Sequence, residues 1–352
     1  MEINSLVREN IKKLKPYTSA RQGYLSGILL DANENSFGSV VESNLQLNRY
    51  PDPNQNILRD KLSNYLKIKK ENLFVGVGSD EIIDLLVRIF CEPRIDNVII
   101  TEPTYGMYKV ACDISNVAAK TVPLNNEFQL DINSIKNSVD ENTKLVFCCS
   151  PNNPTGNLLY KKNILETAKS INGLLIVDEA YVDFIESGSS IDLINEQNNI
   201  IVMRTFSKAW GLAGIRAGYC IADKSIIDYL FKIKSPYNLN KMTSDIILSA
   251  LDNIQKKNYF IEQINQQKEL LINQLKKNKY VDKIFPSDAN FVLVKFKNGK
   301  YLYDELVKKG IILRDRSGQL NLQNCIRITI GNEEENNILI KELERFNEEN
   351  IY

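Results

Sequence analysis

Short apolar runs rich in Val, Ile and Leu recur through the first two thirds of the chain, with helical patterns between them. The helical pattern is clearest over residues 81–90 and 164–171. Strands that are apolar throughout and alternate with helices indicate a largely parallel sheet covered on both faces. Such sheets bind ligands at the carboxyl ends of their strands. The predicted strands are residues 73–77, 98–101, 145–149, 174–177 and 200–203.

The pattern changes near residue 242. Residues 242–275 predict one long amphipathic helix, and three further strands follow with helices between and after them. We therefore expect an α/β chain of two domains. The large one spans residues 28–241, and the small α/β domain comprises residues 242–352 together with an N-terminal arm, residues 1–27. The expected strands of the small domain are residues 291–296, 311–314 and 326–330.

Composition narrows the class of function. Lys and Arg together number 44, as do Asp and Glu, so the formal charge is zero and gives no support for binding nucleic acid or a polyanionic membrane. No segment has the apolar length of a membrane span, and the first residues lack the apolar core of a signal peptide. We expect a cytoplasmic protein.

Histidine is absent, which excludes Ser-His-Asp catalysis, Cys-His catalysis and His-ligated metals. Acid–base chemistry is left to Lys, Tyr, Asp, Glu or Cys. The six cysteines have no Cys-x-x-Cys spacing, and most lie in or beside apolar runs. We expect buried thiols in a reducing compartment, with no disulfide and no metal site.

One segment surrounds a lysine with phosphate-binding chemistry. Residues 205–218 read Thr-Phe-Ser-Lys-Ala-Trp-Gly-Leu-Ala-Gly-Ile-Arg-Ala-Gly and follow a predicted strand. Ser207 and Arg216 are close enough in sequence to share one phosphate, and the amine of Lys208 could form a Schiff base with an aldehyde cofactor. The segment indicates a pyridoxal phosphate site. The alternative is a solvated lysine in a glycine-rich loop.

Three other motifs follow predicted strands. Residues 76–81, Gly-Val-Gly-Ser-Asp-Glu, open a helix, where free amides either bind a phosphate or are simply capped. Residues 150–156 form a stiff Pro/Asn turn that could hold Asn153 toward a ligand. Asp178 could cap a helix, coordinate magnesium or hold a cationic ring nitrogen. Magnesium would call for a Walker-type loop, which the chain lacks.

Together these motifs resemble the fold-type I pyridoxal phosphate enzymes, and specifically the histidinol-phosphate aminotransferases. The cofactor motifs are common to many aminotransferases, whereas the tyrosine-rich and arginine motifs are narrower. Trp210 stands where other members often have Phe. The resemblance runs nearly end to end, over residues 14–17, 19–21, 31–34, 49–52, 78–81, 103–108, 150–156, 178–181, 205–218, 310–315 and 325–329.

The resemblance implies a role for each residue around the cofactor. Lys208 would carry pyridoxal phosphate and move the proton, Asp178 would pair with the pyridine nitrogen, and Tyr181 with Asn153 would bond the ring hydroxyl. Tyr105 would stack on the ring. The cofactor phosphate would be held by the amides of Ser79 and Asp80, the hydroxyls of Thr205 and Ser207, the guanidinium of Arg216, and Tyr50 of a neighbouring subunit in a homodimer.

It also implies the substrates, which are histidinol phosphate with 2-oxoglutarate in this family. Tyr17 would line the imidazole pocket and Asn153 would contact the substrate. Arg327 would bind mainly the α-carboxylate of glutamate and Arg314 mainly the substrate phosphate. Both arginines are expected to be buried, so structural ion pairs with Asp315 or a glutamate are the alternative.

Three other functions stay open. A lyase acting on an amino-acid phosphate such as threonine phosphate would use the same cofactor site. An aromatic aminotransferase would need no substrate-phosphate site. A transcription regulator of this fold would need an attached DNA-binding domain, and the segment before the large domain is too short for one.

Overall fold

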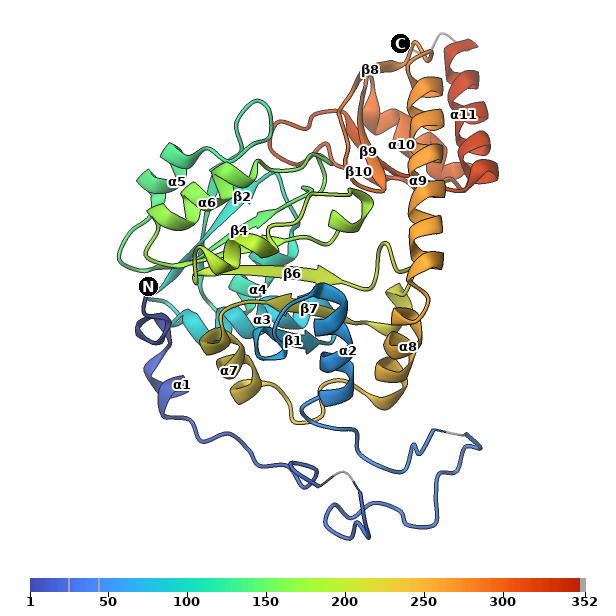
Figure 1. The fold of residues 1–352 in the computed structure, drawn as a ribbon. Helices are drawn as coiled ribbons and strands as arrows, with labels where there is room; N and C mark the ends of the chain where they lie inside the picture. The colour runs from blue at the N-terminus through green and yellow to red at the C-terminus, as the bar shows by residue number, and fades with distance from the viewer. Residues whose placement is uncertain (25, 44, 349–352) are drawn as a thin grey trace.

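The computed structural model describes residues 1–24, 26–43 and 45–348 and contains two sheets (Figure 1). The larger sheet has the strand order β1-β7-β6-β5-β4-β2-β3. In it β7 pairs antiparallel with both β1 and β6, whereas the pairs from β6 to β3 are parallel. The carboxyl ends of β1, β2, β4, β5 and β6 therefore share one edge. Its strands are β1 Leu73–Gly76, β2 Asn97–Glu102, β3 Ala118–Pro123, β4 Thr143–Cys149, β5 Leu174–Asp178, β6 Ile200–Thr205 and β7 Gly218–Ile221.

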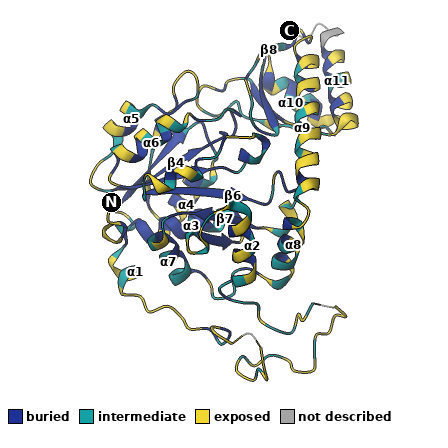
Figure 2. Cartoon of the chain, viewed as in Figure 1, coloured by how far each residue is buried: buried dark blue, intermediate teal, exposed yellow. Residues whose placement is uncertain are grey.

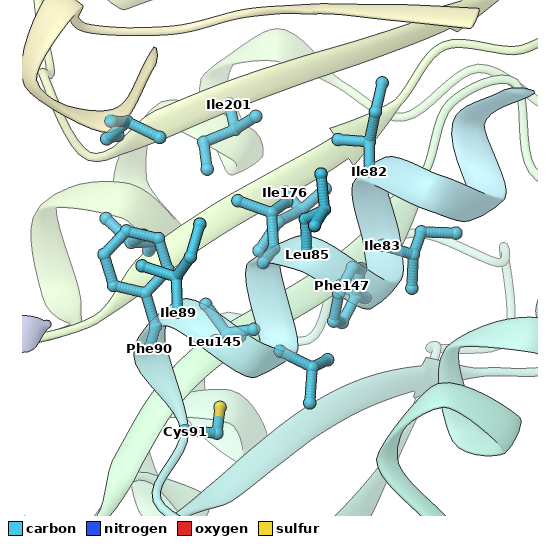
Figure 3. Packing of buried hydrophobic residues seen from close by; sticks show 14 of the residues in the cluster. Ile82, Ile83, Leu85, Ile89, Phe90, Cys91, Leu145, Phe147, Ile176 and Ile201 are labelled. Carbon is cyan, nitrogen blue, oxygen red and sulfur yellow. The ribbon is translucent and has the colours of Figure 1, made fainter. Parts of the chain in front are cut away.

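Helices cover both faces of this sheet because successive strand residues point to opposite sides. Phe147 belongs to the apolar layer that includes residues of α3, α4 and α7, whereas its neighbour Val146 belongs to the layer with residues of α2, α5, α6 and α8. Figure 3 shows the first of these layers, in which apolar side chains of α3 meet those of the strands. The helices are α2 Asn56–Leu66, α3 Gly78–Phe90, α4 Met107–Ile114, α5 Ile132–Ser138, α6 Lys161–Ser170, α7 Lys224–Ile233 and α8 Lys241–Leu251.

The five strands predicted for the large domain are all present. The pattern missed β3, an edge strand in which only one residue is buried and which is therefore not apolar throughout. It also missed β7, which has only four residues. Short 3-10 turns join several elements: η1 Ile3–Leu6, η2 Lys70–Asn72, η3 Val182–Phe184, η4 Ile191–Asn195 and η5 Ala213–Ile215.

The smaller sheet is antiparallel, in the order β10-β11-β9-β8. Helices α9, α10 and α11 bury one of its faces. The predicted strand at 311–314 is wrong in extent, since pairing is confined to its last residue and the next one. These elements are β8 Val281–Ile284, β9 Phe291–Phe296, β10 Arg314–Asp315, β11 Cys325–Thr329, α9 Ile254–Leu275, α10 Gly299–Lys308 and α11 Glu333–Glu348.

The single helix predicted over residues 242–275 is wrong. Two helices, α8 and α9, are separated at Asp252 and Asn253. The Asn253 side chain donates to the carbonyl of Ser249 at 2.8 Å, a local bond that competes with the helical ladder. Among the described residues, no helix is both long and apolar enough to cross a membrane.

The N-terminal residues pack on the large domain. Ile3 and Val7 are buried with α3 and α7, and the backbone N–H of Arg8 donates to Ile89 O at 3.1 Å. The prediction that they pack with the small domain is wrong, because an amphipathic segment such as α1 Glu9–Lys13 does not specify its partner. The segment between α1 and α2 loops away from the body and is largely exposed (Figures 1 and 2). The domain boundaries near residues 28 and 241 stay predictions.

We predict that Gly218→Ala destabilises the fold. A Cβ at residue 218 would lie 2.5 Å from Ser79 N and 2.8 Å from Gly78 C, and backbone cannot yield as a flexible side chain does. Such overpacking costs about 1 to 3 kcal/mol. Denaturant unfolding measures the loss. Gly214→Ala is the matched control, since a Cβ there meets nothing within 4 Å; equal stability of both variants would contradict the prediction.

Candidate active site

The carboxyl ends of the parallel strands meet around a pocket of about 140 Å³. Nine residues predicted from the sequence to bind or act on a cofactor line this one cavity. They come from five separate strand ends, so only the sheet brings them together. They are Ser79, Asp80, Tyr105, Asn153, Asp178, Tyr181, Thr205, Ser207 and Lys208. Arg216, just before β7, lines it as well.

Asp178, the last residue of β5, is a buried carboxylate at the base of the pocket, with 3% of its surface exposed. Burial raises its pKa from 3.8 to about 6, against hydrogen bonds that lower it. Tyr108 Oη donates to Asp178 Oδ2 at 2.7 Å, and Ala180 N donates to Oδ1 at 3.1 Å. The carboxylate is fixed in orientation, and a cation beside it would favour its charged form.

Lys208 lies on the loop after β6. Burial lowers the pKa of its amine, and the positive charge of Arg327 lowers it further. Its Nζ lies 5.6 Å from the centre of the Tyr181 ring. The amine is thus in the same pocket as the buried carboxylate and is easier to deprotonate than a surface lysine, which suits a nucleophile or a base.

The start of α3 offers a second feature, a place for an anion. The N-cap residue, Val77, makes no side-chain capping bond, and Glu81 Oε2 accepts from Val77 N, at 2.6 Å. The first amides of the helix itself have no intrahelical partner. Gly78 has φ +76°, and a Cβ there would lie 3.1 Å from Arg216 Nη2. Arg216 also donates to Asp80 Oδ2 at 3.2 Å. Free amides, a helix terminus and a guanidinium can together hold a phosphate.

Arg327 of the small domain reaches Asn153, a residue that lines the pocket. Arg327 Nη1, on β11, donates to Asn153 Oδ1 at 2.5 Å, and Asn153 Nδ2 donates to Tyr181 Oη at 3.4 Å. Burial lowers the pKa of the Arg327 guanidinium. A chain of polar contacts therefore runs from the small sheet to the large one, past the lysine.

Two predicted substrate residues lie differently from the expectation. Arg314 pairs in register with Arg327 across β10 and β11. Arg314 is exposed and Arg327 is half-buried, so the prediction that both arginines are buried is wrong for Arg314 and correct only in part for Arg327. Arg314 begins β10, a two-residue strand at the edge of the sheet, where its side chain is exposed. Tyr17 is 76% exposed and lines a cleft beside α7, outside the Lys208 pocket.

Tyr50 is also outside the pocket of its own chain. Glu34 is buried, and it accepts from Arg21, from Arg49 Nη1 at 2.8 Å and from Tyr50 N at 2.7 Å. The Tyr50 ring stacks on Tyr237 with centroids 4.4 Å apart. The motif residues near the N-terminus thus form an ion cluster that fixes Tyr50 on the outer surface, where it is 50% exposed.

Sequence reasoning assigned no role to two other residues. Tyr108 belongs to a recognised motif, but only the fold shows that its hydroxyl reaches Asp178. Arg316 follows β10, and its Nε is buried without a hydrogen-bond partner. The one feature of the sequence that could have pointed to Arg316 is that it stands two positions after Arg314, the distance at which strand residues share a face.

Comparisons with known proteins agree with this geometry. Residues 26–343 match the family described as aminotransferase class I and II. A histidinol-phosphate aminotransferase of Cytophaga hutchinsonii is 43% identical over 98% of this chain and 99% of the relative.

Solved structures are similar as well. A histidinol-phosphate aminotransferase of Sinorhizobium meliloti in complex with pyridoxal-5'-phosphate has a TM-score of 0.81 and 25% identity, covering 90% of each chain. An L-threonine-O-3-phosphate decarboxylase of Porphyromonas gingivalis has a TM-score of 0.73 at 23% identity, covering 85% or more of each chain. The second likeness shows the fold alone.

We predict that Asp178→Asn stabilises the ligand-free protein and does so more as pH rises. The pKa of Asp178 is about 6 in the fold against 3.8 when exposed, so the fold binds its proton more tightly and loses stability as pH rises between these values. The asparagine carries no charge, so its advantage should grow from pH 4 to 6 and then level off, on the order of 2 kcal/mol.

Denaturant unfolding at several pH values, compared between variant and parent, measures this advantage. Asp113→Asn is the control, because Asp113 is an exposed carboxylate on α4 paired with Lys109. An advantage that is the same at every pH would contradict the assignment of the buried charge.

Proposed function

Since the chain belongs to the histidinol-phosphate aminotransferases of aminotransferase class I and II, we propose that it transfers the amino group between histidinol phosphate and 2-oxoglutarate, using the Lys208 pocket. The products are imidazole acetol phosphate and glutamate, a step of histidine biosynthesis. The observation that carries the proposal is one pocket lined by Lys208, buried Asp178 and Asn153, with Arg327 bonded to that asparagine.

Pyridoxal phosphate fits the residues present. Asp178 lacks a strong cationic partner in the described chain and would gain one in the pyridine nitrogen. The free amides of Ser79 and Asp80 at the start of α3, with Arg216, suit the cofactor phosphate. Thr205 and Ser207 line the same end of the pocket, and Tyr105 offers a ring face.

When bound, this cofactor supplies an aldehyde that joins covalently to an amine and a cationic ring that withdraws electrons from the substrate carbon. Lys208 would hold this aldehyde and, once free, would be the base that moves the proton at the substrate carbon. Asp178 would keep the ring nitrogen in its charged form, while Tyr181 and Asn153 would donate to the ring hydroxyl.

The substrates differ in charge: one carries a phosphate, the other two carboxylates. Guanidinium groups can grip either anion in bidentate fashion. We assign Arg327 mainly to the α-carboxylate of glutamate and Arg314 mainly to the phosphate. The bond from Arg327 to Asn153 supports the first assignment, because it brings that arginine to the lysine. Tyr17 could line the imidazole pocket only from another subunit.

Turnover of histidinol phosphate, phenylalanine and threonine phosphate with the purified enzyme tests the function. Histidinol phosphate should be used with the highest kcat/KM, with glutamate formed from 2-oxoglutarate. Equal use of phenylalanine would favour the aromatic aminotransferase. Release of carbon dioxide from threonine phosphate would favour the lyase, an alternative kept by the shared fold.

We predict that Lys208→Ala prevents covalent attachment of the cofactor. Borohydride should fix the cofactor to Lys208 in the parent, as peptide mapping by mass spectrometry can show, and kcat should fall by at least 10²- to 10⁴-fold, roughly the contribution of a positioned base. Lys234→Ala is the control. The Lys234 amine also lies buried, with a pKa lowered to about 8, but outside the pocket. Label on Lys234 in place of Lys208 would contradict the assignment.

We propose a cytoplasmic homodimer. The segment between α1 and α2 exposes several large apolar side chains away from the body, among them Phe37 and Val40. Apolar surface of this kind marks an interface, and a second copy of the chain is the partner whose site lacks Tyr50. All six cysteines are buried free thiols, which suits a reducing compartment.

We predict complementation between two impaired chains. If Tyr50 serves the other subunit, mixing Tyr50→Ala with Lys208→Ala subunits gives hybrid dimers with one intact site. The mixture should then exceed both parents in activity after refolding together. Tyr50→Ala must first be shown to be impaired; if mixing restores nothing, Tyr50 acts within its own chain.

A further inference from the structure

Three arginines project from one face of the β10–β11 ladder. Arg314 is opposite Arg327 in the antiparallel register, and opposite residues lie on the same face. The pairing continues one position further, because Arg316 N donates to Cys325 O at 2.9 Å. Since faces alternate with a period of two, Arg316 shares the face of Arg314 and Arg327. The other face, with Ile326, packs against the helices of the small domain.

Arg316 is a half-buried cation without a partner. Its guanidinium makes no hydrogen bond or ion pair with a described residue, and its Nε is fully covered. Arg327 Nε is likewise covered and unsatisfied. The pKa of Arg316 is lowered to about 10, mainly by burial and in addition by the charges of Arg327 and Arg314. Nearby Asp315 sits on the opposite face of the strand and accepts from Ser317 N at 2.8 Å.

The segment that carries Arg316 is held against the Lys208 pocket. Gln319 Nε2 donates to Thr104 O at 3.1 Å, and Thr104 precedes the pocket residue Tyr105. Arg316 also shares its face of the small sheet with Arg327, whose guanidinium reaches the pocket residue Asn153. A buried donor left unpaired is costly, so the arrangement needs an anion to complete it.

We propose that Arg316 is a third guanidinium of the substrate anion site and makes the site selective for a dianionic phosphate monoester. The inference rests on the proposed function and deepens it. Two arginines suffice to grip a carboxylate, and a third leaves excess positive charge that a second negative charge would offset. Arg316 is thus a specificity residue for the phosphate-bearing substrate, with less effect on glutamate.

The test uses enzyme saturated with pyridoxal phosphate, so that the cofactor phosphate site is filled. Calorimetry measures the Kd of inorganic phosphate, and kinetics measure KM for histidinol phosphate and for glutamate. Arg316→Gln should weaken both phosphate measures by about tenfold or more, the effect of a lost charge-assisted contact. Glutamate KM should change much less. Arg316→Lys should recover part of the loss, because it keeps the charge without the planar fork.

Arg345→Gln is the matched control, since Arg345 lies on α11, across the small sheet, in an exposed pair with Glu342. Phosphate Kd unchanged in Arg316→Gln, or an equal loss for glutamate, would overturn the proposal. If Arg316→Gln does not fold, the ratio of the KM for histidinol phosphate to the KM for glutamate is compared between Arg316→Lys and the parent. A ratio that does not rise would overturn the proposal. Should the parent fail to use histidinol phosphate, the proposed function fails, while the phosphate titration still tests Arg316.

Discussion

A carboxylate buried at the end of a central strand is the constraint on which this site depends. Asp178 cannot move into solvent without breaking β5, and its charge is costly without a cation. Tyr108 fixes the direction in which the carboxylate points. The neighbouring strand ends supply the other groups at fixed distances, because the parallel ladder sets their spacing. A cationic ring nitrogen beside Asp178 would pair with this carboxylate, which has no strong cationic partner in the described chain.

The small domain adds charge of the opposite sign. Its antiparallel register places arginines side by side on the face toward the pocket, although like charges repel. The bond from Arg327 to Asn153 joins this face to the large sheet. The small domain is thereby joined to the turn that carries Asn153, so the groups that we propose for the substrate anion and for the cofactor ring belong to one arrangement.

In the segment between α1 and α2, charged side chains are buried and apolar ones are exposed. The side chains of Arg21 and Glu34 form a buried ion cluster that holds the backbone of Tyr50, whereas the large apolar side chains of the same segment remain exposed. Within one chain this is an inverted pattern, with charges inside and apolar groups outside. A second copy would resolve it by covering the apolar surface and receiving Tyr50.

The sequence by itself determined the parallel sheet, since its strands are buried on both faces and therefore apolar throughout. It also predicted which residues meet at the pocket, because Asp178 ends such a strand and Lys208 and Asn153 come after two others. It missed β3 and the break between α8 and α9, and it placed the N-terminal residues on the wrong domain. An exposed edge strand lacks an apolar run, and an amphipathic segment does not specify the surface it covers.

Only the tertiary structure decided that Tyr108 reaches Asp178, that Arg314 is exposed and that Arg316 lies unpaired beside Arg327. Those facts depend on register and burial between segments far apart in the chain, which local pattern cannot encode.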